Sequence, residues 1–116
     1  MTYLFVYGTL RSGFHNRYAR MLRNQAVLVG GGQVQGRVYR MFGYPALRLA
    51  RSCGFVRGEL YAVRDPNSLF KVLDRYEGRS YRRVICRAQL NERAVYAWVY
   101  EWRWRLPAWR SVGLGS

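Results

Sequence analysis

The alternation of hydrophobic and polar positions along the chain predicts several short strands and two helices. Residues 2–7 (TYLFVY) are apolar on both faces, which is typical of a central strand. A short helix is expected over residues 17–23, because Asn16 can cap its first turn. Further extended segments, separated by glycines and by a Gly-Tyr-Pro turn, are expected at residues 26–29, 34–41, 46–50 and 55–63. Gly58 lies inside the last of these segments and indicates a bulge or a tight bend.

The clearest helical pattern follows residue 65. Asp65 stands at the N-cap, Pro66 at the first helical position, and Gly78 is a typical stop. Between them runs an apolar stripe formed by Leu69, Val72, Leu73 and Tyr76. We therefore expect an amphipathic helix that ends at Glu77.

Two strands are expected near the end of the chain, over residues 83–90 and 96–104. The second carries aromatic side chains at every other position, namely Tyr96, Trp98, Tyr100, Trp102 and Trp104. We interpret this stripe as the filling of a small barrel, and the alternative is a platform that stacks single-stranded bases. The whole pattern predicts a small α+β protein, built as a curled mixed β-barrel with two flanking helices.

Length and composition limit the class of protein. The 116 residues suit a single domain over 1–116, and 50% hydrophobic residues exclude intrinsic disorder. No apolar run reaches the roughly 20 residues of a membrane span, and a signal peptide is not recognisable. Cys53 and Cys86 are read as reduced thiols, so we expect a cytoplasmic protein without membrane contact.

The net charge of +14, from twenty basic and six acidic residues, favours anionic partners. The arginines are spread from Arg11 to Arg110 and often alternate with apolar residues. A solvated basic surface is therefore the favoured interpretation. A dedicated nucleic-acid groove is the alternative, and any nucleic-acid binding is expected to be non-specific.

The Gly8–Gly13 segment (GTLRSG) spaces its glycines as a P-loop does, but Phe14 and His15 replace the required Lys-Ser/Thr pair. Nucleotide hydrolysis is thereby disfavoured. The loop can still turn backbone N–H groups toward an anionic or carbonyl oxygen. His15 lacks a partner histidine and the two cysteines are 33 positions apart, so a zinc site is not expected. No local signature supports a Ser–His–Asp or Cys–His nucleophile.

The acidic residues provide few candidates for a catalytic carboxylate: Glu59, Asp65, Asp74, Glu77, Glu92 and Glu101. Asp65 is explained as a helix cap. Glu77 stands at the negative end of its helix dipole, which raises the pKa of a carboxylate toward the range of a general base. Nearby Arg82 and Arg83 act in the opposite direction, and a solvated helix-end glutamate is the alternative interpretation.

Together these motifs resemble the γ-glutamylcyclotransferase-like family, in its AIG2-like and γ-glutamylamine cyclotransferase branch. The matching segments are FVYGTLRSG at 5–13, GYPAL at 43–47, GELYAV at 58–63, LDRYEG at 73–78, YRR at 81–83 and AVYAWVYEW at 94–102. Their order and spacing cover nearly the whole chain. The resemblance implies a barrel whose mouth holds a γ-glutamyl group.

The resemblance also implies site residues. The substrate-binding segment of the family corresponds to Tyr7, Gly8, Thr9 and Leu10, the catalytic glutamate to Glu77, and a tyrosine at the cavity edge to Tyr81. The implied reaction is an intramolecular aminolysis that releases 5-oxoproline and a free amine or amino acid without metal or cofactor. Two alternatives stay open, namely a basic nucleic-acid-binding or scaffold module and a non-catalytic binder of a γ-glutamyl-like metabolite.

Overall fold

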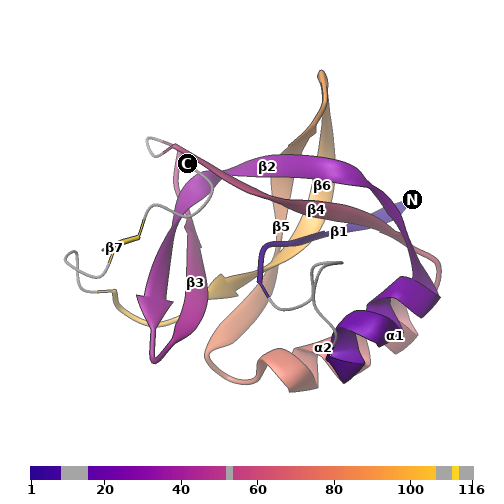
Figure 1. Cartoon of the computed structure of the whole chain (residues 1–116), viewed down its shortest axis with the longest axis horizontal. Coiled ribbons are helices and arrows are strands. Elements are labelled where there is room, and N and C mark those ends of the chain that lie inside the picture. The colour runs from indigo at the N-terminus through magenta and orange to yellow at the C-terminus, as the bar shows by residue number, and fades with distance from the viewer. Residues whose placement is uncertain (9–15, 52–53, 107–110, 113–116) are drawn as a thin grey trace.

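Figure 1 shows the computed structural model, which describes residues 1–8, 16–51, 54–106 and 111–112. Thr9, Leu10, His15 and Cys53 lie outside the described residues. The helices are α1 (Arg17–Gln25) and α2 (Pro66–Glu77). The strands are β1 (Thr2–Val6), β2 (Ala26–Met41), β3 (Tyr44–Leu49), β4 (Phe55–Val63), β5 (Tyr81–Leu90), β6 (Arg93–Trp102) and β7 (Ser111–Val112).

Five strands form a closed barrel in the order β2-β4-β1-β6-β5, and a short pairing of β5 with β2 completes the ring. The pairing of β1 with β6 is parallel, whereas the other barrel pairings are antiparallel. β3 and β7 pair with β2 outside this ring. The expectation of a small mixed barrel with two flanking helices is confirmed.

The strand β2 is longer than expected from the sequence. Residues 26–29 and 34–41 were expected as separate segments, but one strand runs through the glycines between them. Gly30 has a φ of 156°, and the register with β4 shifts between Leu28 and Gly30. A bulge and consecutive glycines let a strand bend without breaking, as barrel closure requires. The irregularity therefore lies in β2 and not at Gly58, which keeps its regular pairing with Gly32.

The barrel interior is filled by aliphatic side chains and Phe5, and not by the aromatic stripe of β6. All five barrel strands contribute to one core cluster, to which β6 adds Val95, Ala97 and Val99. The alternate residues Trp98 and Tyr100 pack in a different cluster, together with residues of both helices. The prediction that the stripe fills the barrel is wrong, because the small side chains of β6 take the narrow interior and its rings face outward.

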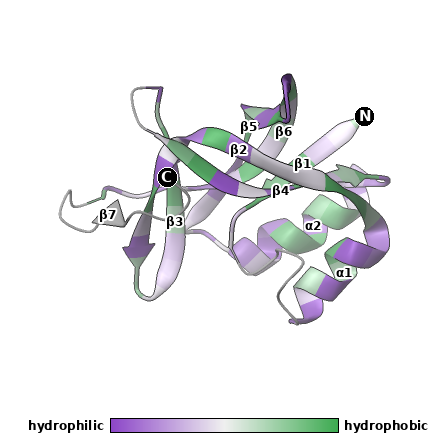
Figure 2. Ribbon diagram, turned by 45° about the horizontal axis from the view of Figure 1, so that its top comes forward, coloured by the Kyte–Doolittle hydropathy of each residue, from purple (hydrophilic) through white to green (hydrophobic). Residues whose placement is uncertain are grey.

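The helices lie beside each other against the outside of the barrel, as Figures 1 and 2 show. Both begin as expected: the Asn16 side chain accepts the Ala19 N–H at 2.8 Å, and Asp65 accepts the Ser68 N–H at 3.3 Å. In α2 the buried residues are Leu69, Phe70 and Leu73. Green and purple bands alternate along both helices in Figure 2, as in amphipathic helices. No helix among the described residues is long and apolar enough to cross a membrane.

Candidate active site

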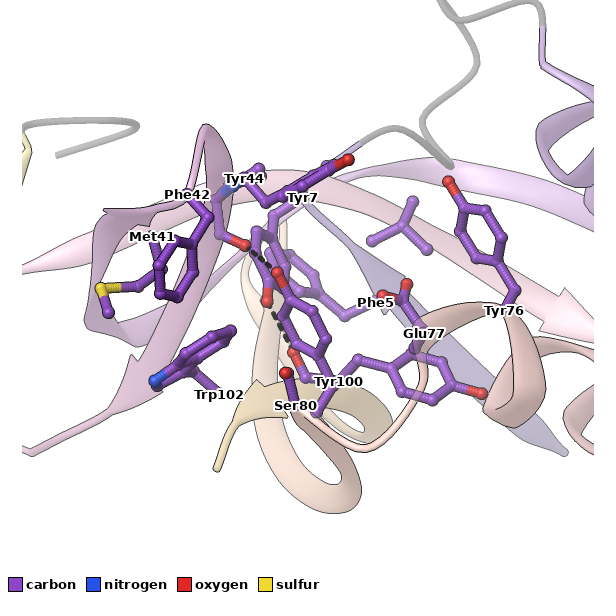
Figure 3. A pocket seen from close by; sticks show the side chains of 14 residues that line it. Phe5, Tyr7, Met41, Phe42, Tyr44, Tyr76, Glu77, Ser80, Tyr100 and Trp102 are labelled. Carbon is purple, nitrogen blue, oxygen red and sulfur yellow. Dashed lines mark hydrogen bonds between the residues drawn. The ribbon is translucent and has the colours of Figure 1, made fainter. Parts of the chain in front are cut away.

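A pocket of about 480 Å³ opens where the end of β1, the end of α2 and the β2–β3 turn meet (Figure 3). Its lining includes Tyr7, Gly8, Glu77 and Tyr81, four of the six residues that the sequence pointed to. The other two, Thr9 and Leu10, lie outside the described residues. Segments near the start, middle and end of the chain are thus brought together at a cavity of the size that small-molecule sites have.

Glu77 is the only charged side chain among the described residues that line this pocket. It is the last residue of α2, and Gly78, with a φ of 77°, ends the helix directly behind it. No described residue makes a hydrogen bond or an ion pair with its carboxylate. Burial raises the pKa of Glu77 to about 7, because the anion is removed from water without compensation by a cation. Such a carboxylate can both accept and return a proton near neutral pH.

Tyr7 and Tyr81 use their hydroxyl groups to hold β3 against the barrel. The Tyr7 hydroxyl donates to the Tyr100 carbonyl at 2.6 Å and accepts the Leu47 N–H at 3.2 Å. The Tyr81 hydroxyl donates to the Pro45 carbonyl at 2.6 Å. Burial is the main cause that raises the pKa of both phenols, so both stay neutral. We infer that these two residues shape the pocket and fix the β2–β3 hairpin at its edge.

Gly8 lines the pocket beside Pro45, and its backbone does not take the positive φ that would demand glycine. A β-carbon built on Gly8 would lie 3.4 Å from the Pro45 side chain, which is close contact without a severe clash. We expect Gly8→Val to raise the Kd for the γ-glutamyl ligand that the resemblance implies at least about 10-fold while the unfolding midpoint changes little, because the added methyl groups occupy pocket space. Titration calorimetry and urea unfolding of the same preparation check this, and an unchanged Kd would show that Gly8 does not face the ligand.

Asp74 anchors the last turn of α2, three residues before Glu77. Its carboxylate accepts the Tyr100 hydroxyl at 2.7 Å and the Arg83 Nε–H at 2.9 Å. The Arg83 guanidinium also lies over the rings of Phe70 and Trp98, at 4.2 and 4.6 Å from their centroids. Desolvation acts to raise the pKa of Asp74, but the hydrogen bonds from Arg83 and Tyr100 and the charge of Arg83 lower it below its usual value. These contacts hold the end of α2 in place and therefore position Glu77.

We expect Asp74→Asn to lower the free energy of unfolding at pH 7 by about 1 kcal/mol, a modest loss because the ion pair is partly exposed. A lowered carboxylate pKa stabilises the fold above the usual pKa near 4, and this contribution is lost as the pH falls through the lowered value. The variant should therefore lose less stability than the wild type between pH 4 and pH 2. Urea unfolding at several pH values tests this, and parallel pH curves for the two proteins would contradict it.

Glu101 and Cys86 are not among the described residues that line the pocket. Glu101 is 5% exposed, accepts the Leu49 N–H at 2.9 Å and pairs with Arg82 at 3.2 Å, so its role is structural. Burial, followed by the charge of Glu101, raises the pKa of the Cys86 thiol to about 12. Within the described residues no group of three or more His, Cys, Asp or Glu side chains is arranged to hold a metal ion.

The pocket also contains residues to which the sequence interpretation gave no role. Met41, Phe42 and Tyr44 reach it from the β2–β3 turn, while Tyr100 and Trp102 reach it from β6. The sequence predicted a Gly-Tyr-Pro turn at this place, and the GYPAL segment at 43–47 belongs to the resemblance, but neither signal placed the turn at the pocket. The β6 rings were assigned to the barrel interior. The sequence alone does not show which face of this strand points inward, so their direction could not be predicted. Because Trp102 is 5% exposed and Arg83 covers Trp98, the stripe does not form a continuous base-stacking surface.

Comparison with solved structures shows similar folds in distant organisms. An AIG2-like protein from Mus musculus is 25% identical, with a TM-score of 0.76 over 94% of this chain and 82% of that chain. An uncharacterised protein from Pyrococcus horikoshii is 21% identical, with a TM-score of 0.73 over 97% of this chain and 86% of that chain. No curated protein matches the sequence.

The family comparison covers the barrel and the pocket together. The family model described as gamma-glutamyl cyclotransferase, AIG2-like, matches residues 4–112. This range includes the end of β1, the whole of α2, the β2–β3 turn and the residues of β5 and β6 that line the pocket. The chain belongs to the AIG2-like gamma-glutamyl cyclotransferase family.

Proposed function

We propose that this protein releases 5-oxoproline and a free amine from a γ-glutamyl amide by intramolecular aminolysis, with Glu77 as general acid and base. The observation that carries the proposal is a buried carboxylate that pairs with no described residue and whose pKa is raised to about 7. The described residues that line the pocket include no other charged side chain. Membership of the cyclotransferase family supports this class of reaction.

The first step is removal of a proton from the α-ammonium group of the substrate by Glu77. An α-amino group has an ordinary pKa of about 8, and that of a glutamate is about 4.3. Raising the pKa of Glu77 to about 7 makes the transfer nearly balanced, since each unit of mismatch costs about 1.4 kcal/mol. The buried position of Glu77 therefore provides a base of suitable strength at neutral pH.

The freed amine then attacks the γ-carbonyl carbon of the same molecule, and a new C–N bond closes a five-membered ring. The bond to the leaving nitrogen breaks, and Glu77 returns its proton to that nitrogen. No other reactant is consumed. The protein's main task is to fold the substrate so that amine and carbonyl meet, because the reaction is already intramolecular. Backbone N–H groups at Gly8, Thr9 and Leu10 are proposed to hold the α-carboxylate or the developing oxyanion.

Purified protein incubated with γ-glutamyl amines and γ-glutamyl dipeptides should produce 5-oxoproline, detected by mass spectrometry. The same compounds should raise the melting temperature of Glu77→Gln, since the variant still binds them. A melting shift in both proteins without product in either would identify a non-catalytic binder. Neither shift nor product from any compound would contradict the proposed function.

A further inference from the structure

We propose that the leaving amine carries an uncharged, ring-sized apolar group, which is received by the side chains of Met41, Phe42 and Trp102. This inference rests on the proposed function, because it assigns the part of the substrate that departs. We call these three side chains the apolar wall. In the view of Figure 3 they lie on one side of the pocket and Tyr76 on the other, with Glu77 between them.

Phe42 is the strongest single indication. It is 81% exposed, so its ring contributes little to the folded core, yet it lines the pocket. Its φ is 53° and that of Gly43 is 84°, in a two-residue turn flanked by the Met41–Tyr44 pair. Asn-Gly is the usual choice for such a turn, and a bulky residue with positive φ is unfavourable. A phenylalanine that is both strained and solvent-exposed is explained if its ring contacts a ligand.

The remainder of the wall is fixed in place. Met41 and Trp102 are 8% and 5% exposed and pack together with Ala46. The hydrogen bonds from the Tyr7 and Tyr81 hydroxyls to β3 hold the hairpin that presents Phe42. A ring entering this part of the pocket therefore meets a preformed surface, and little ordering is needed on binding.

The charges of the site argue against an amino acid as the leaving group. The chain has twenty basic residues, yet no described residue that lines the pocket is a cation. A carboxylate on the leaving amine would lose water against an apolar wall, with no cation among the described lining residues to pair with it, and it would be repelled by Glu77. An amine without that carboxylate avoids both the loss of water and the repulsion.

Three probes separate these effects: the γ-glutamyl amides of methylamine, phenethylamine and phenylalanine. The methylamine and phenethylamine compounds differ by a benzyl group, which carries the ring. The phenethylamine and phenylalanine compounds differ by one carboxylate. We expect kcat/KM for the phenethylamine compound to exceed that for the methylamine compound by about 10–100-fold, the usual effect of burying a ring-sized group. It should exceed that for the phenylalanine compound by at least about 10-fold.

The matched variants are Phe42→Asn and Phe55→Ala. Asparagine accepts the left-handed turn conformation, so Phe42→Asn should keep or raise the melting temperature while the ring is lost. We expect it to raise KM for the phenethylamine compound about 10-fold and to change KM for the methylamine compound several-fold less, so that the preference for the ring is lost. Phe55, which is 43% exposed on β4 and outside the pocket lining, provides the control and should change neither.

The outcomes separate this inference from the proposed function. Turnover of all three compounds at similar kcat/KM, or a preference for the phenylalanine compound, would overturn the inference and leave the function standing. Without turnover of any compound the function fails, and the inference is then decided by titration calorimetry. Tighter binding of the phenethylamine compound that Phe42→Asn removes would support the apolar wall, and equal binding of the three compounds would refute it.

Discussion

Replacing Glu77 with glutamine is expected to lower kcat for a γ-glutamyl amine by about 10²–10⁴-fold while the substrate still binds. The two side chains have nearly the same shape, so the pocket should persist. The amide cannot accept a proton from the α-ammonium group, and no other described residue lining the pocket offers a carboxylate. Steady-state measurement of 5-oxoproline, with substrate binding followed separately by calorimetry, checks both parts of the expectation.

The control for this variant is Glu92→Gln, because Glu92 is exposed in the turn between β5 and β6. Glu101 is less suitable, since its buried carboxylate holds Leu49 and Arg82, and its replacement would disturb the fold. If Glu77→Gln keeps full turnover, Glu77 is not the general base. A loss of equal size in Glu92→Gln would point to damage unrelated to the pocket.

The pH dependence gives a second readout of the same residue. A base must be ionised to act, so kcat/KM of the wild type should rise with pH through a limb near pH 7 that is absent in Glu77→Gln. The free energy of unfolding should instead fall over this range of pH. The pKa of Glu77 is higher in the folded protein than in the unfolded chain, so its ionisation destabilises the fold as the pH rises from about 4.5 to about 7. Above pH 7 the glutamine variant should be more stable than the wild type by up to about 3 kcal/mol, because the pKa rises from 4.5 to about 7 and each unit corresponds to about 1.4 kcal/mol.

The largest expected loss of stability comes from Gly58→Ala in the middle of β4. A β-carbon at this position would clash with the Val6 carbonyl oxygen and would lie 2.6 Å from the Phe5 ring. Because Val6 belongs to the neighbouring barrel strand β1, the clash cannot be relieved without moving backbone. We expect the free energy of unfolding to fall by about 2–4 kcal/mol, as for severe overpacking. Urea unfolding followed by tryptophan fluorescence measures this change.

Gly31→Ala provides the matched control on the opposite strand. A β-carbon at Gly31 would meet only the Gly58 carbonyl oxygen at 3.9 Å, and its φ is not positive. We expect this substitution to change the free energy of unfolding by less than about 1 kcal/mol. Equal stability of the two variants would show that β1 and β4 do not approach each other as closely as the structure indicates.

Local signals made the helices predictable from sequence. Asn16 and Asp65 cap α1 and α2 as expected, and Gly78 ends α2 directly after Glu77. These features depend on neighbouring residues only, so the sequence contains them in full. The position of Glu77 at a helix end could therefore be predicted. Its burial could not, because the walls around it come from β1, β6 and the β2–β3 turn.

Features that depend on the closed barrel were missed or misassigned. The aromatic stripe of β6 was recognised, but period two alone does not tell which face of a strand points inward. Asp74 received no role from the sequence beyond its place among the acidic candidates, yet Tyr100 and Arg83 bind it from β6 and β5. The helix dipole was expected to raise the pKa of Glu77, whereas burial is the cause that the structure supplies. In each case the missing information was which residues distant in the chain become neighbours.

The central claim, that Glu77 drives ring closure, is tested most directly by the products formed from one 13C-labelled γ-glutamyl amine at pH 8. Aminolysis gives labelled 5-oxoproline and the free amine in equal amounts, whereas attack by water gives labelled glutamate. NMR of the reaction with wild type, Glu77→Gln and Glu92→Gln distinguishes these products in a single series. We expect equimolar 5-oxoproline and amine from wild type and Glu92→Gln, and at least about 100-fold slower formation in Glu77→Gln. Labelled glutamate as the main product, or undiminished 5-oxoproline from Glu77→Gln, would contradict the assignment.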